Sequence, residues 1–271
     1  MAYNYRQINY EVMADTKHCY ESIPELVESV RHSIDKQYMI SQEESIELSI
    51  PEKVNTKYIV SGKRSFEAAK EYADKKTAVL NYANNHSIGG APFSAGAQEE
   101  SLCRCSTLLP CLEAMKEPFY LKHRNQYSSH EMDFMGNDDL IYTPDVVVFK
   151  SDERTEPVYP RMMNSEEWYR VNVITCAAPQ LFGTVVRPTN YEDAIRSRIK
   201  RILDVAAKEH NEVVILGAWG CGAFKNPIEI VAKLFVDLVR NYDFEIVEFA
   251  LATTNDVRSS AFARYLRENA E

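Results

Sequence analysis

The sequence lacks the features of a membrane, secreted or nucleic-acid-coating protein. No apolar run approaches the roughly 18 residues of a membrane-spanning helix, and the opening stretch MAYNYRQINYEV contains no apolar segment typical of a signal peptide. The net charge is −9, whereas binding along a nucleic-acid backbone needs a surplus of lysine and arginine. We therefore expect a cytoplasmic protein that binds neither membranes nor, non-specifically, nucleic acid. A small anionic ligand is still compatible with this charge, because local backbone dipoles can outweigh it.

Metal-site spacing is also missing. The six cysteines include no C-x-x-C pair, and the six histidines are scattered. Cys103 and Cys105 are two residues apart on a predicted helix, so their side chains point to different faces. We expect free thiols in a reducing compartment, with a zinc site as the alternative. No metal and no cofactor is predicted.

The chain of 271 residues is long enough for one large domain, or one domain with an appendage. Residues 1–45 are polar and predicted to be helical. Beyond them, predicted strands lie at 45–50, 57–61, 78–83, 171–179 and 244–253. Residues 140–150 are predicted to be a strand pair or one long strand broken at Pro144, and residues 212–220 a strand and turn. Predicted helices lie at 63–76, 98–109, 191–210, 226–241 and 257–269. This alternation indicates an α/β fold, with a parallel or mixed sheet covered on both faces.

Three local signals define the ends of these helices. Pro110 is expected to end the helix that starts at residue 98. Asn226 is a plausible N-cap, and Pro227 suits the first position of the helix that follows.

Two loops follow predicted strands and precede helices, where α/β sheets bind ligands. The first, NYANNHSIGGAPFSAGAQEE, is longer than most connections in compact domains. Gly89 and Gly90 would let its backbone approach a phosphate or a ribose closely. The alternative is a surface loop whose glycines only form turns.

The second loop, GAWGCGAFKNP, has three glycines within six residues. It leads into a helix whose free N–H groups and dipole favour an anion. It matches neither the P-loop nor the G-x-G-x-x-G fingerprint. It would bind phosphate, or else form a tight turn packed under Trp219.

Glu99 and Glu100 open the helix after the first loop. Adjacent helical side chains diverge by about 100°, so only one of them can point fully into a cleft. Two anion-binding loops suggest a diphosphate ligand, and a carboxylate beside one of them suggests that a glycosidic bond is cut. Alternatively, the glutamates only complement the helix dipole.

Together these motifs resemble the microbial-type poly(ADP-ribose) glycohydrolases, a branch of the macrodomain family. That branch has a G-G-G triplet followed, after a short spacer, by Q-E-E. Here GGAPFSAGAQEE supplies Gly89 and Gly90, then Gln98, Glu99 and Glu100. Further similar stretches are ADT at 14–16, VLNYAN, LCRCSTLLPCL and GAWGCGAFKNP. Ala91 departs from the pattern, because it occupies the position of the third glycine.

The resemblance implies a three-layer α/β/α macrodomain with a mixed central sheet at 46–271, and a helical extension at 1–45 packed on it. It implies an enzyme that cleaves ribose glycosidic bonds in poly(ADP-ribose), free or on a modified protein. Glu100 would be the catalytic acid and base, and Glu99 would hydrogen-bond the ribose and the leaving side. The implied ligand-binding residues are Asn84, Gly89, Gly90, Ala91, Gln98, Gly220, Cys221, Gly222, Ala223 and Phe224.

In this scheme Asn84 and Phe224 hold the terminal ribose, and Gly220 to Ala223 cradle the diphosphate. Two other functions stay open at this point. A methyl group at Ala91 could turn the same pocket into a non-catalytic ADP-ribose reader. The enzyme could also act on another NAD-derived metabolite.

Overall fold

The computed structural model describes residues 3–48, 55–152, 159–183, 186–253 and 256–268. Its sheet has seven strands in the order β1-β4-β5-β3-β6-β7-β2. The strands are β1 (Tyr38–Ile40), β2 (Lys57–Ser61), β3 (Thr77–Ala83), β4 (Leu140–Val148), β5 (Tyr169–Ala177), β6 (Val213–Leu216) and β7 (Ile246–Ala250). β1, β4 and β5 pair antiparallel, and β5, β3, β6, β7 and β2 pair parallel, so the sheet is mixed.

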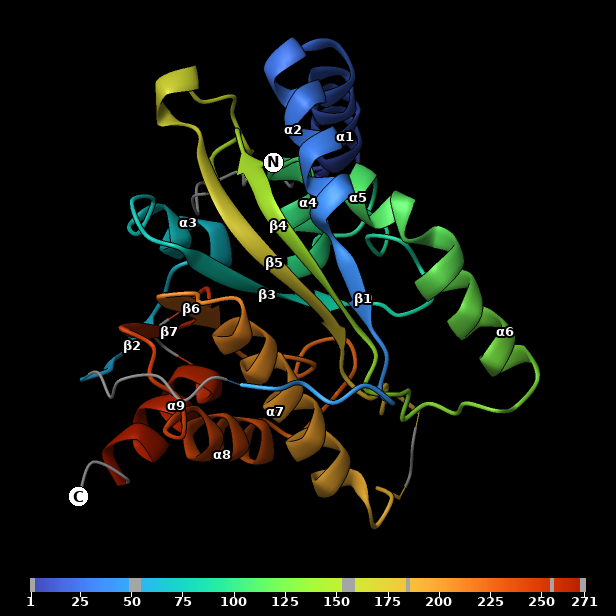
Figure 1. The fold of residues 1–271 in the computed structure, drawn as a ribbon, viewed down its shortest axis with the longest axis vertical. Coiled ribbons are helices and arrows are strands. Elements are labelled where there is room, and N and C mark those ends of the chain that lie inside the picture. The colour runs from blue at the N-terminus through green and yellow to red at the C-terminus, as the bar shows by residue number, and fades with distance from the viewer. Residues whose placement is uncertain (1–2, 49–54, 153–158, 184–185, 254–255, 269–271) are drawn as a thin grey trace.

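Helices cover both faces of this sheet (Figure 1). They are α1 (Tyr5–Ser22), α2 (Pro24–Lys36), α3 (Ser65–Lys70), α4 (Gln98–Cys105), α5 (Leu108–Ala114), α6 (Lys122–Ser128), α7 (Tyr191–Lys208), α8 (Ile228–Val239) and α9 (Val257–Glu268). A π-helical turn at Lys116–Leu121 precedes α6, and a 3-10 turn at Ser165–Glu167 precedes β5.

Two hydrophobic cores lie on opposite faces of the sheet because side chains alternate along each strand. In β3, Leu80 belongs to the core under α7–α9, and its neighbour Val79 belongs to the core under α1–α5. Ile174 and Val173 of β5 divide in the same way. This is the three-layer macrodomain-like architecture that the sequence predicted.

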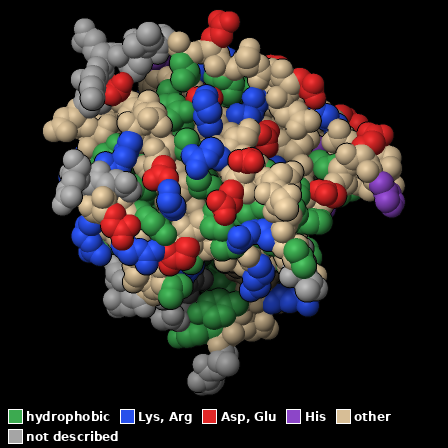
Figure 2. Space-filling view, turned by 90° about the horizontal axis from the view of Figure 1, so that it is seen from below, with side chains coloured by type: hydrophobic (Ala, Val, Ile, Leu, Met, Phe, Trp, Pro, Cys, Tyr) green, Lys and Arg blue, Asp and Glu red, His purple; other side chains and the backbone are tan. Residues whose placement is uncertain are grey.

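The outer face of the α7–α9 layer carries lysine, arginine and acidic side chains side by side (Figure 2). Lys200 pairs with Asp204 on α7, and Lys233 pairs with Asp237 on α8. Both pairs are spaced i,i+4, which places oppositely charged neighbours on one helix face.

Several local predictions were wrong. Residues 45–48 form no strand, and positions 49–50 of that predicted strand lie outside the described residues. Pro110 does not end the helix from residue 98, which stops at Cys105; it lies in the first turn of α5, where a missing N–H costs little. Asn226 does not cap α8, because the helix starts at Ile228 after Pro227.

Three further differences concern the extent of elements. The predicted helix 63–76 shortens to α3. The predicted strand 140–150 is one strand, β4, with a register shift between Thr143 and Val146 around Pro144. The short strand β1 was not predicted. It lies within residues 1–45 and pairs with β4 at the edge of the sheet. The boundary at residue 45 between a helical extension and the macrodomain stays a prediction.

The helix α1 is anchored to the rest of the fold by the residues of the ADT stretch. Thr16 is fully buried, and its hydroxyl donates to the carbonyl oxygen of Arg104 at 2.6 Å. Arg104 lies in the last turn of α4, whose carbonyls have no partner within the helix. Asp15 accepts from the buried Lys150 Nζ at 2.6 Å.

We predict that Thr16→Val lowers the free energy of unfolding by about 1–3 kcal/mol, because it leaves the Arg104 carbonyl buried without a donor. Thr16→Ser keeps the hydroxyl and is the matched control, which should lose less. Urea denaturation monitored by fluorescence measures both. Equal stability of wild type and Thr16→Val would show that this hydrogen bond does not anchor α1.

Candidate active site

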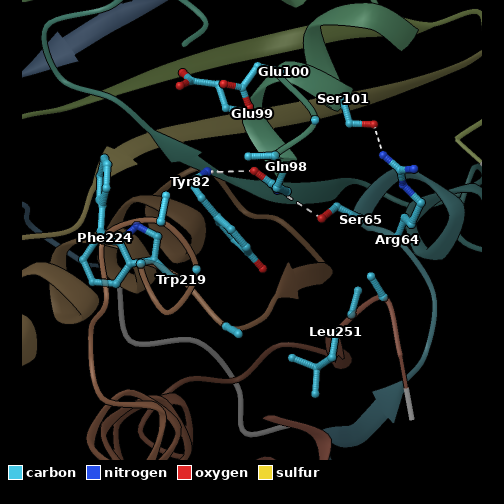
Figure 3. Close-up of a pocket in the computed structure, with 18 of the residues that line it drawn as sticks. Arg64, Ser65, Tyr82, Gln98, Glu99, Glu100, Ser101, Trp219, Phe224 and Leu251 are labelled. Carbon is cyan, nitrogen blue, oxygen red and sulfur yellow. Dashed lines mark hydrogen bonds between the residues drawn. The ribbon is translucent and has the colours of Figure 1, made fainter. Parts of the chain in front are cut away.

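A cleft of about 810 Å³ opens where the parallel strands β3, β6 and β7 end. Because β3 and β6 are neighbours, the two loops singled out in the sequence lie at the same sheet edge. Figure 3 shows the pair of glutamates above the cleft, Phe224 and Trp219 at one side, and Arg64 at the other. The predicted residues that line the cleft are Asn84, Gly90, Gln98, Glu99, Glu100, Gly220, Gly222, Ala223 and Phe224.

The first loop is shaped by two glycines in the left-handed region, Gly89 with φ +63° and Gly90 with φ +68°. At Gly90 a Cβ atom would lie 2.4 Å from Oε1 of Glu100, so any side chain there would push the Glu100 carboxylate from its place. The turn delivers the backbone N–H of Ala91 to the same oxygen at 3.1 Å. The glycine-rich stretch therefore holds Glu100 in place through direct backbone contact.

Glu100 is 8% exposed, and only one of its carboxylate oxygens is used by the protein. Oε1 accepts from Ala91, whereas Oε2 is buried and has no hydrogen-bond partner within the described part of the chain. A buried polar atom normally has a partner, so one without a protein partner is a natural contact point for a ligand.

Glu99 is more deeply buried, with 3% of its surface exposed. The Asn84 backbone N–H donates to its Oε2 at 2.9 Å, and Asn81 Nδ2 donates to its Oε1 at 3.2 Å. Burial outweighs these two hydrogen bonds and raises the pKa of Glu99 to about 8. The helix start, which favours a charged glutamate, does not determine the protonation of this side chain.

Gln98 connects the start of α4 to the neighbouring strand. Its Oε1 accepts from the Tyr82 N–H at 2.9 Å, and its Nε2 donates to the Leu80 carbonyl at 2.8 Å and to Ser65 Oγ at 3.0 Å (Figure 3). Because β3 and α4 are fixed to each other in this way, Gln98 sets where the following glutamates lie.

The second loop turns sharply at two glycines. A Cβ at Gly217 would lie 2.2 Å from the Tyr82 hydroxyl, and one at Gly220 would lie 2.4 Å from Ala178 Cβ. Asn226 holds the turn closed, because its Nδ2 donates to the carbonyls of Pro179 and Gly220 at 2.8 and 3.0 Å.

The tip of this loop is open. A Cβ at Gly222 would meet nothing within 4 Å, so protein packing does not require glycine there. In the described chain, the amides of Gly222 and Ala223 donate to no protein acceptor. Exposed amides on a tight turn form an anion-binding concavity. Trp219 packs beneath, fully buried, with its Nε1 donating to the Cys176 carbonyl at 2.9 Å.

Three predicted residues do not line the cleft. Gly89 lies beneath the loop, where a Cβ would come within 2.8 Å of Leu109 and 3.0 Å of Cys103 Sγ. Cys221 turns its Sγ to the Trp219 carbonyl at 3.5 Å, and burial raises the pKa of its thiol to about 12. Ala91 is exposed and has no positive φ, so its methyl neither strains the loop nor enters the cleft.

Two groups near the site were not predicted. Arg64 and Ser101 line the far side of the cleft and both bond Asp152, at 3.0 Å from Arg64 Nε and 2.7 Å from Ser101 Oγ. The fully buried His123 contacts the Asn85 carbonyl through Nδ1 and Asp139 through Nε2, each at 3.0 Å. Arg64, His123, Asp139 and Asp152 lie outside the motifs and far apart in the sequence, so only the fold reveals them.

Within the described ranges, no group of three or more histidine, cysteine or acidic side chains could hold a metal ion. Likewise, no helix in the described part is long and apolar enough to cross a membrane.

The fold and the cleft together define a macrodomain-like protein with a carboxylate pair at its ligand site. The sequence profile described as "Microbial-type PARG, catalytic domain" matches residues 10–151, just over half of the chain. The chain therefore belongs to the microbial-type poly(ADP-ribose) glycohydrolase family, as its motifs predicted, and it is a glycohydrolase.

Solved structures agree with this assignment. Poly(ADP-ribose) glycohydrolase from Thermomonospora curvata, bound to the inhibitor ADP-HPD, is 28% identical with a TM-score of 0.77, over 94% of this chain and 98% of that one. The Deinococcus radiodurans enzyme in complex with ADP-ribose is 27% identical with a TM-score of 0.72, over 88% and 97%. A search of curated proteins found no match.

We predict that Gly90→Ala lowers the free energy of unfolding by about 1–3 kcal/mol, because the new methyl meets the Glu100 carboxylate and φ stays positive. Ala91→Gly, one residue further, changes an exposed methyl and should shift stability by about 1 kcal/mol or less. Urea denaturation of the two variants tests the difference. Similar losses in both would mean that Gly90 is not the constrained position.

The raised pKa of Glu99 also predicts a pH dependence. The folded-state pKa of about 8 lies above the usual value of 4.5, so protonated Glu99 favours the folded state at low pH. That contribution is lost as pH rises towards and through about 8. As pH rises from 5 to 8.5, the free energy of unfolding of wild type should therefore fall relative to that of Glu99→Gln, by on the order of 2–4 kcal/mol in total.

Urea denaturation across this pH range measures the difference, with the exposed Glu25→Gln as the control. A stability difference between wild type and Glu99→Gln that does not vary with pH would contradict the assigned pKa.

Proposed function

We propose that this protein hydrolyses the ribose glycosidic bond of poly(ADP-ribose), with Glu100 as general acid and then general base. The observation that carries the proposal is the carboxylate of Glu100 in the lining of the cleft: its Oε1 is held by the Ala91 amide, and its buried Oε2 has no hydrogen-bond partner among the described residues. The family membership and the ADP-ribose-bound relative support the choice of ligand.

The chemistry follows from the environment of each carboxyl group. Breaking the bond at the anomeric carbon builds up oxocarbenium-like positive charge on the ribose. Glu100 donates its proton to the leaving oxygen, and its carboxylate then takes a proton from the attacking water. Glu99, neutral below a pKa of about 8, hydrogen-bonds the ribose without adding a second negative charge beside Glu100.

The loops supply the binding contacts. Gly222 and Ala223 donate their free amides to the diphosphate. Asn84, whose amide reaches Glu99, and Phe224 both line the cleft and contact the terminal ribose. Gln98 contributes chiefly by fixing α4 to β3. Gly90 allows the ribose close to the backbone because it has no side chain.

The alternative, a non-catalytic ADP-ribose reader, depended on the Ala91 methyl disturbing the pocket, and this position gives it no support. The methyl that distinguishes this chain from the family pattern is exposed, and the Ala91 N–H still reaches Glu100. The substrate is free poly(ADP-ribose) or poly(ADP-ribose) on a modified protein. We place the enzyme in the cytoplasm, because all six cysteines are free thiols, the state that a reducing compartment maintains.

We predict that Glu100→Gln lowers the hydrolysis rate by about 10²–10⁴, because the substitution removes the titrating group and keeps the shape. ADP-ribose affinity should stay within a few-fold of wild type. Glu99→Gln should reduce turnover less, and the exposed Glu113→Gln should change nothing. Mass detection of released ADP-ribose and calorimetric titration measure the two properties. Hydrolysis by Glu100→Gln at the wild-type rate would refute the assignment.

A further inference from the structure

A second cavity, of about 630 Å³, adjoins the catalytic cleft. It is lined by His86, Arg124, Tyr127, Phe134, Gln180 and Phe182. Two contacts place it beside the cleft. His86 follows two residues after Asn84, which lines the cleft, and the ring of Phe182 lies 6.4 Å from that of Phe224. The cavity is therefore next to the end of the cleft where Phe224 lies.

The side chains of this cavity are aromatic and cationic. Phe182 is 56% exposed, so its ring presents an open aromatic face at this cavity. Tyr127 meets His86 edge to face, with ring centroids 5.2 Å apart. Arg124 is exposed and uses its Nε to donate to the His86 carbonyl at 2.6 Å, and its terminal guanidinium nitrogens donate to no acceptor among the described residues.

One buried polar atom in the cavity also needs a partner. Gln180 Nε2 is buried and has no hydrogen-bond partner among the described residues. Its own backbone N–H is already used, donating to the Phe134 carbonyl at 2.8 Å. Flat aromatic faces, a guanidinium and a free amide donor are the groups that bind a nucleobase and a phosphate.

The substrate chemistry suggests which nucleotide this is. In linear poly(ADP-ribose), the scissile bond joins the anomeric carbon of one unit to a ribose hydroxyl of the adenosine in the next. If the terminal unit fills the cleft, an adenosine is the leaving group and must lie directly beside the glutamates. A single ADP-ribose molecule, by contrast, has nothing to place there.

We propose that the second cavity binds the adenosine and adjacent phosphate of the unit that leaves. The adenine stacks on Phe182 and Tyr127, and Arg124 contacts the phosphate. This inference rests on the proposed function, because it takes the polymer as substrate. With this site, the enzyme should bind a chain of at least two units more tightly than a single ADP-ribose.

The test compares binding of ADP-ribose and of a linear ADP-ribose dimer to the Glu100→Gln variant, so that turnover does not interfere. The dimer should bind more tightly than the monomer. Adding Phe182→Ala should lower the affinity for the dimer by about fivefold to 100-fold, the usual effect of losing one base–aromatic stack. The affinity for the monomer should change by about twofold or less. Adding Arg124→Gln, which keeps an N–H donor for His86, should weaken the dimer most at low salt.

Matched controls are Tyr3→Ala, an aromatic with 50% exposure, and Arg31→Ala on α2, whose side chain only pairs with Glu28. Neither should alter the dimer-to-monomer ratio. An unchanged ratio in Phe182→Ala and Arg124→Gln, or an equal loss for both ligands, would overturn the inference. So would a selective loss for an ADP-ribosylated peptide, because the cavity would then serve the carrier protein.

The proposed function fails separately, if wild-type enzyme releases no ADP-ribose from the polymer. Because the dimer-to-monomer ratio is measured on the inactive variant, it reports on the second cavity whatever the outcome of that assay.

Discussion

The close approach of the Gly90 backbone to the Glu100 carboxylate is the constraint on which the site depends. No Cβ fits between them, and the next amide, that of Ala91, holds one oxygen of Glu100. Other parts of the fold keep this loop in position. Arg104 donates to the carbonyls of Pro92 and Ala95, and Asn9 of α1 donates to Ala95 as well. Glycines, a buried arginine and an N-terminal helix thus all support the loop that holds one oxygen of Glu100 and leaves the other without a partner among the described residues.

The two adjacent glutamates take different roles in the proposed mechanism because their surroundings differ in burial and in hydrogen-bond partners. Glu99 faces inwards to Asn81 and the Asn84 amide, and burial raises its pKa. Glu100 keeps one oxygen unpartnered at the cleft. A neutral carboxyl beside a reacting one avoids the repulsion of two charges in a small volume. The parallel pairing of β3 with β6 then brings the diphosphate loop to the same edge, so binding and chemistry meet in one cleft.

Much of the fold and of the site could be predicted from the sequence, because strong local patterns determine these strands, helices and motifs. β2 is a β-branched run, β3 is a short apolar run and α7 has an apolar stripe at helical spacing, while the G-G and Q-E-E stretches carry the family signal. The predictions failed where tertiary contacts decide the outcome. Pro110 was predicted to end the helix from residue 98, but it lies in the first turn of the next helix, α5. The sequence also does not show that Gly89 packs against Cys103 or that the Cys221 thiol turns to the Trp219 carbonyl, and ligand binding by these two residues stays a prediction. His123, Asp139 and Arg64 reach the site only through the fold.

The proposed mechanism requires the carboxylate of Glu100 to act at the anomeric carbon of a bound ADP-ribose unit. The most direct measurement is the incubation of wild-type protein with purified poly(ADP-ribose), followed by mass detection of the products over time. We expect steady release of free ADP-ribose that EDTA does not suppress. Binding of ADP-ribose without any release from the polymer would contradict it.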